Sequence, residues 1–290
     1  MKLENIHLIQ TQAAKAFQTD VSEITVEERL LGGMSHLTYV ISYQGIKYTF
    51  RVIGAEGNRF VDREIEHENL KRIVPLNINN ETVYFDESSG EKACLYVEGT
   101  VLSTVPFRPH LKDVALTLKK LHQANVEPAS DYRLLERLDL YESFTQVRSD
   151  VYLDLKQKWI DIYINERQHQ PKVFCHGDAQ RSNIVIGQDR LYLLDWEYSG
   201  WNEFYFDIAS FGNINFADAL ELLDVYLERE ATKDEQNLVR FYRMYQALQW
   251  HQVALRKAMI GLSEVLHFDF NLLAEKYLQL ASTLYTEIKG

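Results

Sequence analysis

Hydrophobic residues recur with two different periods in this chain, and the change falls near Gly99. Before it, short runs rich in β-branched and aromatic residues alternate with polar ones and are separated by glycines, as in antiparallel strands. After it, apolar residues recur at helical spacing over long stretches. Because strands and helices are segregated along the chain, we predict an α+β fold with a small lobe at 1–98 and a larger, mainly helical lobe at 99–290.

The first lobe is predicted to hold an antiparallel sheet and one helix. Its strands are predicted at Ile24–Leu31, Leu37–Tyr43, Ile46–Val52, Thr82–Asp86 and Lys92–Glu98, and its helix at Asn58–Ile73. Gln44 and Gly45 are expected to form a tight hairpin turn between the second and third strands. The second lobe is predicted to be helical around one strand-rich stretch, 173–194. Its helices are predicted at Leu111–Gln123, Leu135–Arg167, Phe216–Arg229, Glu235–Met259 and Leu262–Ile288.

The net charge of the chain and the length of its apolar runs argue against several classes of partner. The chain has 31 Lys+Arg against 42 Asp+Glu, a formal net charge of −11, which disfavours binding to nucleic acid or to an anionic membrane surface. No apolar run approaches the roughly 20 residues that a membrane-spanning helix needs, so no membrane insertion is expected. The two cysteines are far apart, and the N-terminal residues lack the apolar core of a signal peptide. We therefore expect a soluble, cytoplasmic protein.

The densest polar pattern in the chain is His176-Gly-Asp-Ala-Gln-Arg-Ser-Asn183, followed by an apolar hairpin and then Asp195-Trp-Glu-Tyr198. Asp178 can accept the proton of a hydroxyl group or orient that group. Asn183 and Asp195 offer the hard oxygen ligands that suit Mg²⁺ bound to nucleotide phosphates. The apolar run before Asp195 predicts a buried strand, whose end holds a ligand rigidly. The spacing therefore favours a phosphotransferase.

These motifs resemble those of the aminoglycoside phosphotransferase and choline kinase superfamily, a branch of the protein-kinase-like fold, and most of all those of bacterial choline kinases. The similarity extends to Gly32–Ile41, Tyr48–Gly54 and the block Asp195–Ala209, and it covers residues from about 30 to 260. It implies a bilobal kinase-like fold with a small antiparallel β-sheet lobe that carries one helix.

The resemblance also implies which residues bind ATP. They are Gly32, Gly33, Ser35, Arg51 and Glu66. The glycine turn would cover the phosphates with backbone N–H groups, and the guanidinium of Arg51 would hold phosphate oxygens. An acidic residue of the following helix would pair with Arg51; Glu66 is the first candidate, and Glu64 and Glu68 are alternatives. His36 stands where the family commonly has Asn.

Aromatic and acidic side chains that follow Asp195 are typical of a pocket for a quaternary ammonium group, which binds to aromatic faces with a carboxylate nearby. The predicted substrate-binding residues are Glu197, Tyr198, Trp201 and Trp250. Trp250 matches the first tryptophan of a family W-x-x-W helix, but Val253 takes the place of the second. Trp196 and Phe206 are expected in the core. The predicted catalytic residues are Asp178 and His176; for His176, bracing of the loop by hydrogen bonds is favoured over a chemical role. Asp207 is expected to support that loop from beneath.

The sequence thus predicts an ATP-dependent, Mg²⁺-requiring kinase that phosphorylates a small cationic hydroxyl compound, most simply choline. Ethanolamine, thiamine or an aminoglycoside are alternative substrates, and a non-catalytic binding module on a kinase scaffold is a further alternative. The nine histidines form no HxH or HxxxH pair, which argues against a di-metal hydrolase. No GxxxxGK or GxGxxG string is present either, so P-loop and dinucleotide-binding fingerprints are absent from the sequence.

Overall fold

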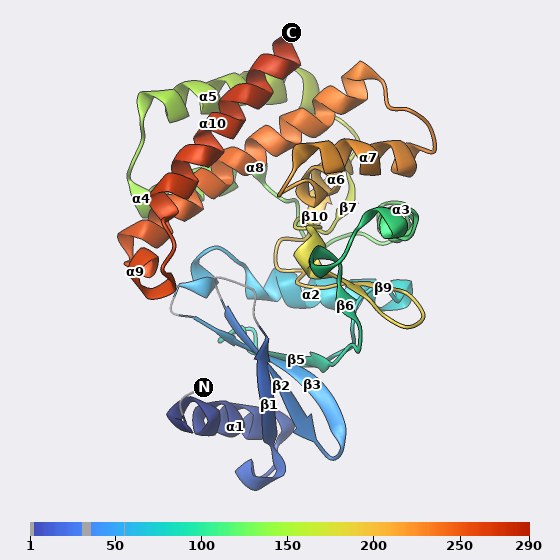
Figure 1. The fold of residues 1–290 in the computed structure, drawn as a ribbon, viewed down its shortest axis with the longest axis vertical. Helices are drawn as coiled ribbons and strands as arrows, with labels where there is room; N and C mark the ends of the chain where they lie inside the picture. The colour runs from blue at the N-terminus through green and yellow to red at the C-terminus, as the bar shows by residue number, and fades with distance from the viewer. Residues whose placement is uncertain (1–2, 31–35, 55) are drawn as a thin grey trace. The chain divides into compact units, whose positions relative to one another are not determined.

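The structure is a computed structural model that describes residues 3–30, 36–54 and 56–290 (Figure 1). The chain forms two compact units. Unit 1 consists of Met1–Asp113, Asn125–Ala129 and Arg181–Ser199, and unit 2 of Val114–Ala124, Ser130–Gln180 and Gly200–Gly290. The lobe boundary expected at Glu98–Gly99 stays a prediction.

Unit 1 is built on a five-stranded sheet in the order β1-β2-β3-β5-β4, in which all neighbouring strands are antiparallel. The strands are β1 (Thr25–Leu30), β2 (His36–Tyr43), β3 (Ile46–Ile53), β4 (Thr82–Phe85) and β5 (Lys92–Leu95). The predicted meander and the two later strands are confirmed. Gln44 and Gly45 form the β2–β3 turn, both with positive φ (50° and 79°), the conformation that two-residue hairpins favour.

Helix α1 (Leu3–Phe17) was not expected from the sequence. It packs its buried residues Ile9, Ala13 and Ala14 against sheet residues that include Tyr39 and Phe50. Its apolar residues recur at helical spacing, so the sequence pattern was a usable signal for this helix.

Helix α2 (Arg63–Ile73) begins at Asp62, whose carboxylate accepts a hydrogen bond from the Ile65 N–H at 3.2 Å. Its buried face carries Arg63, Glu66 and Asn69 as well as apolar residues. The sequence suggested an apolar side interleaved with solvated charges. The buried face is instead partly polar, because these three side chains bind other segments of unit 1.

Two of these side chains join the later segments to unit 1. Asn69 donates to the Ser199 carbonyl at 3.1 Å and accepts from the Ala129 N–H at 2.7 Å. Arg63 donates to Glu197 at 2.9 Å. Unit 1 also contains a small antiparallel sheet in the order β6-β8-β9, whose strands are β6 (Thr100–Val101), β8 (Ile184–Ile186) and β9 (Leu191–Leu193). Helix α2 therefore explains why segments distant in sequence belong to one unit.

Unit 2 is mainly helical, and its central element is α8, most of whose length is buried. Helix α3 (Leu111–His122) begins in unit 1 and continues into unit 2. The other helices are α4 (Leu134–Thr145), α5 (Asp150–Ile162), α6 (Tyr205–Phe211), α7 (Phe216–Leu227), α8 (Lys233–Met259), α9 (Leu262–Leu266) and α10 (Phe270–Lys289). Helix α8 packs along α10 and also against α4 and α6 (Figure 1). The two-stranded sheet of β7 (Val173–Cys175) and β10 (Gly200–Asn202) completes this unit.

Two predicted helices are interrupted in the structure. The helix expected at Leu135–Arg167 ends where Gln146 takes a left-handed conformation (φ 54°), and a new helix begins at Ser149, whose hydroxyl accepts from the Tyr152 N–H. The helix expected at Leu262–Ile288 is broken in the same way, at His267 and Asp269. In both cases a non-glycine residue adopts the left-handed conformation. Helices that end in this conformation usually have glycine there, so the sequence gives little indication of these two ends. Within the described residues, no helix combines the length and apolarity needed to cross a bilayer.

Candidate active site

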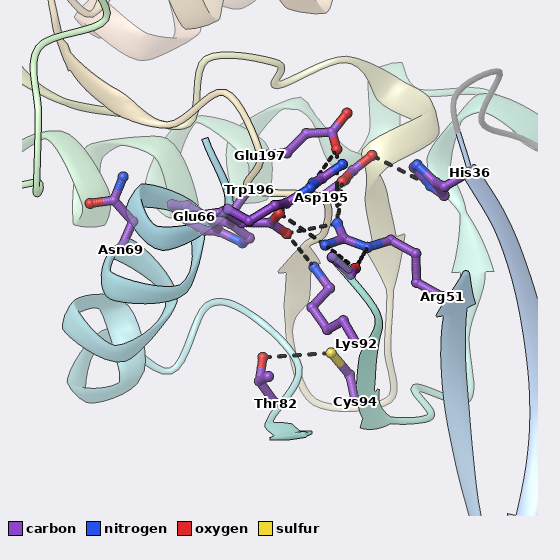
Figure 2. Close-up of polar contacts among 12 residues, drawn as sticks. His36, Arg51, Glu66, Asn69, Thr82, Lys92, Cys94, Asp195, Trp196 and Glu197 are labelled. Atoms are coloured by element: carbon purple, nitrogen blue, oxygen red, sulfur yellow. Dashed lines mark hydrogen bonds and ion pairs between the residues drawn. The ribbon is translucent and has the colours of Figure 1, made fainter. Parts of the chain in front are cut away.

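A buried ion pair joins the sheet of unit 1 to its helix. Arg51 of β3 and Glu66 of α2 form a two-pronged contact, with Nη1–Oε1 at 2.7 Å and Nη2–Oε2 at 2.9 Å (Figure 2). Arg51 is 4% exposed and Glu66 is 1% exposed. Glu64 is exposed and Glu68 bonds to Arg72. Of the three acidic candidates, Glu66 is thus the one placed on Arg51.

Glu66 also binds two further cations. Arg63 Nη1 lies 2.6 Å from Oε2. Lys92 Nζ lies 3.0 Å from Oε1 (Figure 2). Burial by itself would raise the pKa of Glu66, but the charges of Lys92, Arg51 and Arg63 hold that pKa well below its usual range. The carboxylate is therefore ionised at neutral pH and compensates a cluster of buried positive charge.

Asp195 and Glu197 lie next to this cluster. Arg51 Nη1 is 3.7 Å from Asp195 Oδ1 and 3.9 Å from Glu197 Oε2, and Arg63 donates to the same Glu197 oxygen. Burial and the neighbouring charge of Asp195 raise the pKa of Glu197 to about 7. Asp195 has a left-handed backbone (φ 66°). A strained conformation of this kind at a non-glycine residue is often associated with functional sites.

Asn183 and Asp195 are placed at the same end of the β8–β9 hairpin. Ile184 pairs with Leu193, and the Asn183 carbonyl accepts from the Leu194 N–H at 2.8 Å. The two predicted metal ligands therefore flank one hydrogen-bonded pair of strands. Their amide and carboxylate oxygens are the donors that Mg²⁺ prefers.

His36, the first residue of β2, is also directed toward Asp195 (Figure 2). Its Nε2 is 3.9 Å from Asp195 Oδ2. Burial lowers the pKa of His36 despite the nearby carboxylate, so the ring is neutral at pH 7. The predicted phosphate-loop residues Gly32, Gly33 and Ser35 lie outside the described residues.

The loop at His176–Asp178 in unit 2, which the sequence predicts to be catalytic, is held by Asp207. Its two carboxylate oxygens accept the backbone N–H groups of His176 at 2.7 Å and Gly177 at 2.8 Å, and His122 Nε2 lies 3.0 Å from the same group. The Asp178 N–H is 3.2 Å from His176 Nδ1. Asp207 is fully buried. These contacts set the direction in which the chain leaves β7 and presents Asp178.

Replacing Asp207 with asparagine is expected to destabilise this loop. The amide can accept at one position only, so one buried backbone N–H would face an NH₂ group, at a cost of about 1–3 kcal/mol. The urea-unfolding midpoint should fall, and kcat should fall with it. The exposed Asp189 of unit 1 supplies the control, Asp189→Asn, which should leave both values unchanged. Equal effects of the two changes would contradict the bracing role.

Gln180 is a site residue that sequence reasoning missed. Its amide donates to Asp178 Oδ2 at 2.9 Å and in turn accepts from Asn213, whose carbonyl accepts from Arg243 at 3.0 Å. Gln180 lies within the His176–Asn183 motif, two residues after Asp178, so its position was a usable signal. Asn213 and Arg243 are distant from this motif in the sequence, so no comparable signal pointed to them.

The predicted substrate residues fall in both units. In unit 1, Tyr198 is buried, and Glu197 lies among the cations rather than among aromatic rings. In unit 2, Trp201 pairs with Phe174 across β10 and β7, and Trp250 is partly exposed on α8. The substrate roles of these residues stay predictions.

The residues expected in the core are fully packed. Trp196 and Phe206 are each 1% exposed, and the indole N–H of Trp196 donates to the Leu193 carbonyl at 2.9 Å. Both are therefore core residues, as predicted.

Comparison with protein families matches residues 27–256 to the phosphotransferase enzyme family. Protein LicA of Haemophilus influenzae is 27% identical over 188 residues, which cover 62% of this chain and 56% of that protein. Ethanolamine kinase 2 of Mus musculus is 26% identical over 189 residues, 58% of this chain and 48% of that protein. The matched segment thus spans about half of these curated relatives.

Solved structures resemble the chain over nearly its whole length. The choline kinase LicA from Streptococcus pneumoniae has a TM-score of 0.78 at 20% identity, covering 95% of this chain and 98% of that one. A LicA complex with AMP has a TM-score of 0.79 at 20% identity, covering 97% and 99%. At this identity the likeness shows the fold. The predicted α+β class of the kinase-like type is confirmed.

Proposed function

Because this chain belongs to the phosphotransferase enzyme family, matched over residues 27–256, we propose that it is an ATP-dependent kinase. It transfers the γ-phosphoryl group of ATP to the hydroxyl of a small amino alcohol, with choline as the first candidate. The relatives in the comparison support this substrate class, since they include proteins described as choline kinase and ethanolamine kinase.

The observation that carries the proposal is the placement of Arg51. Its guanidinium is fixed by Glu66 on one side and lies 3.7 Å from Asp195 on the other. A buried, oriented cation beside a carboxylate at a strand end suits the phosphate groups of a nucleotide, because planar N–H donors match phosphate oxygens. Glu66 fixes the rotamer of Arg51 before ATP arrives, so less conformational entropy is lost on binding.

Asn183 and Asp195 would hold the Mg²⁺ that accompanies ATP, since their donors are oxygen atoms. The ion supplies charge neutralisation to the phosphate oxygens when it is bound. Asp195 has a left-handed backbone and follows the end of β9, a position that limits the movement of its side chain. The protein therefore contributes mainly preorganisation.

Asp178 would orient the hydroxyl of the substrate and accept its proton. One of its carboxylate oxygens accepts a hydrogen bond from the Gln180 amide at 2.9 Å, which restricts rotation of the side chain. Phosphoryl transfer depends chiefly on positioning and charge stabilisation. A carboxylate whose rotation is restricted in this way meets the requirement for positioning.

Ethanolamine is the second candidate substrate. Choline carries no N–H donor and is recognised by aromatic faces, whereas ethanolamine offers three N–H donors that prefer carboxylates. Val253, which stands where the family has its second tryptophan, is buried and aliphatic. The loss of that aromatic face is the observation that keeps ethanolamine as the second candidate beside choline.

A substrate panel tests the proposal. The protein is incubated with Mg-ATP and separately with choline, ethanolamine, thiamine and kanamycin, and ADP release is followed. ADP formed with choline is the expected result, and ADP formed with ethanolamine alone would move the assignment to the second candidate. No ADP with any of the four would overturn the amino-alcohol kinase and favour a non-catalytic binding module.

A further inference from the structure

We propose that His36 is a nitrogen ligand of the divalent ion that Asp195 would hold, with Glu197 as a further oxygen donor, so that this site favours Mn²⁺ over Mg²⁺ more strongly than an oxygen-only site does. The inference rests on the proposed function, because it concerns the ion that accompanies ATP. It goes beyond that function in naming a ligand and the class of ion that the ligand selects.

The geometry of three side chains supports the site. One ligand atom each from His36, Asp195 and Glu197 lie within 4.8 Å of one another. Atoms bonded to one octahedral ion at about 2.1–2.2 Å are separated by about 3 Å when adjacent and by about 4.3 Å when opposite. Small side-chain rotations therefore bring all three atoms onto one ion.

The two oxygens of Asp195 face different partners. Oδ1 is directed toward Arg51, whereas Oδ2 is directed toward His36 at 3.9 Å (Figure 2). That distance is too long for a hydrogen bond. The neutral imidazole nitrogen and the carboxylate oxygen thus face one another with no hydrogen bond between them. Two ligands of one cation have the same arrangement.

Within the described part of the chain, the ring of His36 makes no hydrogen bond that would indicate another role. Its Nδ1 is buried and has no partner there. The residue is fixed by its place at the start of β2, where it pairs with Ile53 of β3. Its side chain is 12% exposed and that of Asp195 is 24% exposed. A buried polar atom with no partner usually has a functional reason, and the other nitrogen of the same ring, Nε2, is the one directed toward Asp195.

Imidazole nitrogen changes the preference among divalent ions. Mg²⁺ prefers oxygen ligands, whereas affinity for nitrogen-containing sites rises along the series from Mn²⁺ toward Cu²⁺. The asparagine that the family commonly has at this position offers an oxygen instead. His36→Asn is therefore a matched variant that replaces the nitrogen donor with an oxygen donor of similar reach.

A second group of potential ligands, His122, Cys175 and Asp207, does not support a similar site. His122 bonds to Tyr226 through Nδ1 and to Asp207 through Nε2, both at 3.0 Å. The Cys175 thiol faces the carbonyls of Asn202 and Glu203. These atoms already have hydrogen-bonding partners, so we interpret the three residues as a structural hydrogen-bond network.

Pulsed electron paramagnetic resonance of Mn²⁺ tests the proposal directly. The full chain is loaded with Mn²⁺ and a non-hydrolysable ATP analogue, and nitrogen-14 coupling from a bound imidazole is recorded. The coupling is expected in the wild type, lost in His36→Asn, and retained in the control His67→Asn, since His67 bonds to Glu87 instead. The ratio of Mn²⁺ to Mg²⁺ affinity should fall at least about tenfold in His36→Asn alone.

The outcomes separate this inference from the proposed function. If the wild type binds the analogue and turns over ATP but shows no imidazole coupling, or if the coupling survives in His36→Asn, His36 is not a ligand and the kinase assignment stands. If the wild type binds no nucleotide with either ion, the proposed function fails. Unfolding midpoints of the variants show whether a lost signal reflects a lost fold.

Discussion

Replacing Asp178 with alanine is expected to lower kcat by about 10²–10⁴-fold, the range usual for a positioned general acid–base group. The physical reason is that no other carboxylate of the catalytic loop can orient the hydroxyl and accept its proton. Affinity for ATP should change little, because the proposed nucleotide contacts are made by Arg51 and the glycine turn. Steady-state kinetics together with calorimetric titration of ATP measures both quantities.

A control at an exposed carboxylate elsewhere in the chain separates chemistry from folding. Asp189→Ala removes an exposed carboxylate from the β8–β9 turn and should leave kcat unchanged. If Asp178→Ala instead weakens ATP binding with no specific loss of turnover, the catalytic assignment of this loop is wrong. Restoration of part of the rate by Asp178→Glu would support a role in positioning.

Replacing Glu66 with glutamine is expected to destabilise the protein by about 3–5 kcal/mol, the cost of breaking a buried ion pair. Three cations, Arg51, Arg63 and Lys92, would lose the charge that compensates them. The KM for ATP should also rise, because Arg51 would lose its charged partner and be held mainly by its hydrogen bonds to the Gly90 carbonyl. Urea unfolding, followed by tryptophan fluorescence, measures the first effect.

Helix α2 supplies its own control for this experiment. Glu64 is exposed two residues earlier, and Glu64→Gln should change stability by no more than about 0.5 kcal/mol, as surface substitutions usually do. The two variants remove the same charge from the same helix and differ only in burial. A similar loss for both would mean that net charge, and not the buried cluster, sets the stability.

Local features of the fold could be predicted from the sequence. The β2–β3 hairpin follows from alternation and a Gln-Gly turn, and the β8–β9 hairpin from two apolar runs beside polar motifs. The order and spacing of Asp178, Asn183 and Asp195 indicated the chemistry. In each case the signal lies within about ten residues, where backbone preference and hydrophobic period act directly.

Features that depend on distant parts of the chain could not be predicted. Lys92 and Arg63 reach Glu66 only after the strands and α2 have packed, and a Lys or Arg in the sequence is equally typical of a solvated surface. The pairing of Asn69 with Ala129 and Ser199 has the same long-range origin. The break at Gln146 was missed because a single left-handed glutamine has no compositional signature.

The fastening of α2 also bears on how activity in this chain could be controlled. In protein kinases, the position of the corresponding helix controls whether the lysine–glutamate ion pair forms. Here Arg63, Glu66 and Asn69 lie at three-residue intervals and each binds a different segment of unit 1. An outward movement of α2 would leave several buried charges without their partners. Because these contacts hold α2 in place, an inactive state with a displaced helix would be costly for this chain.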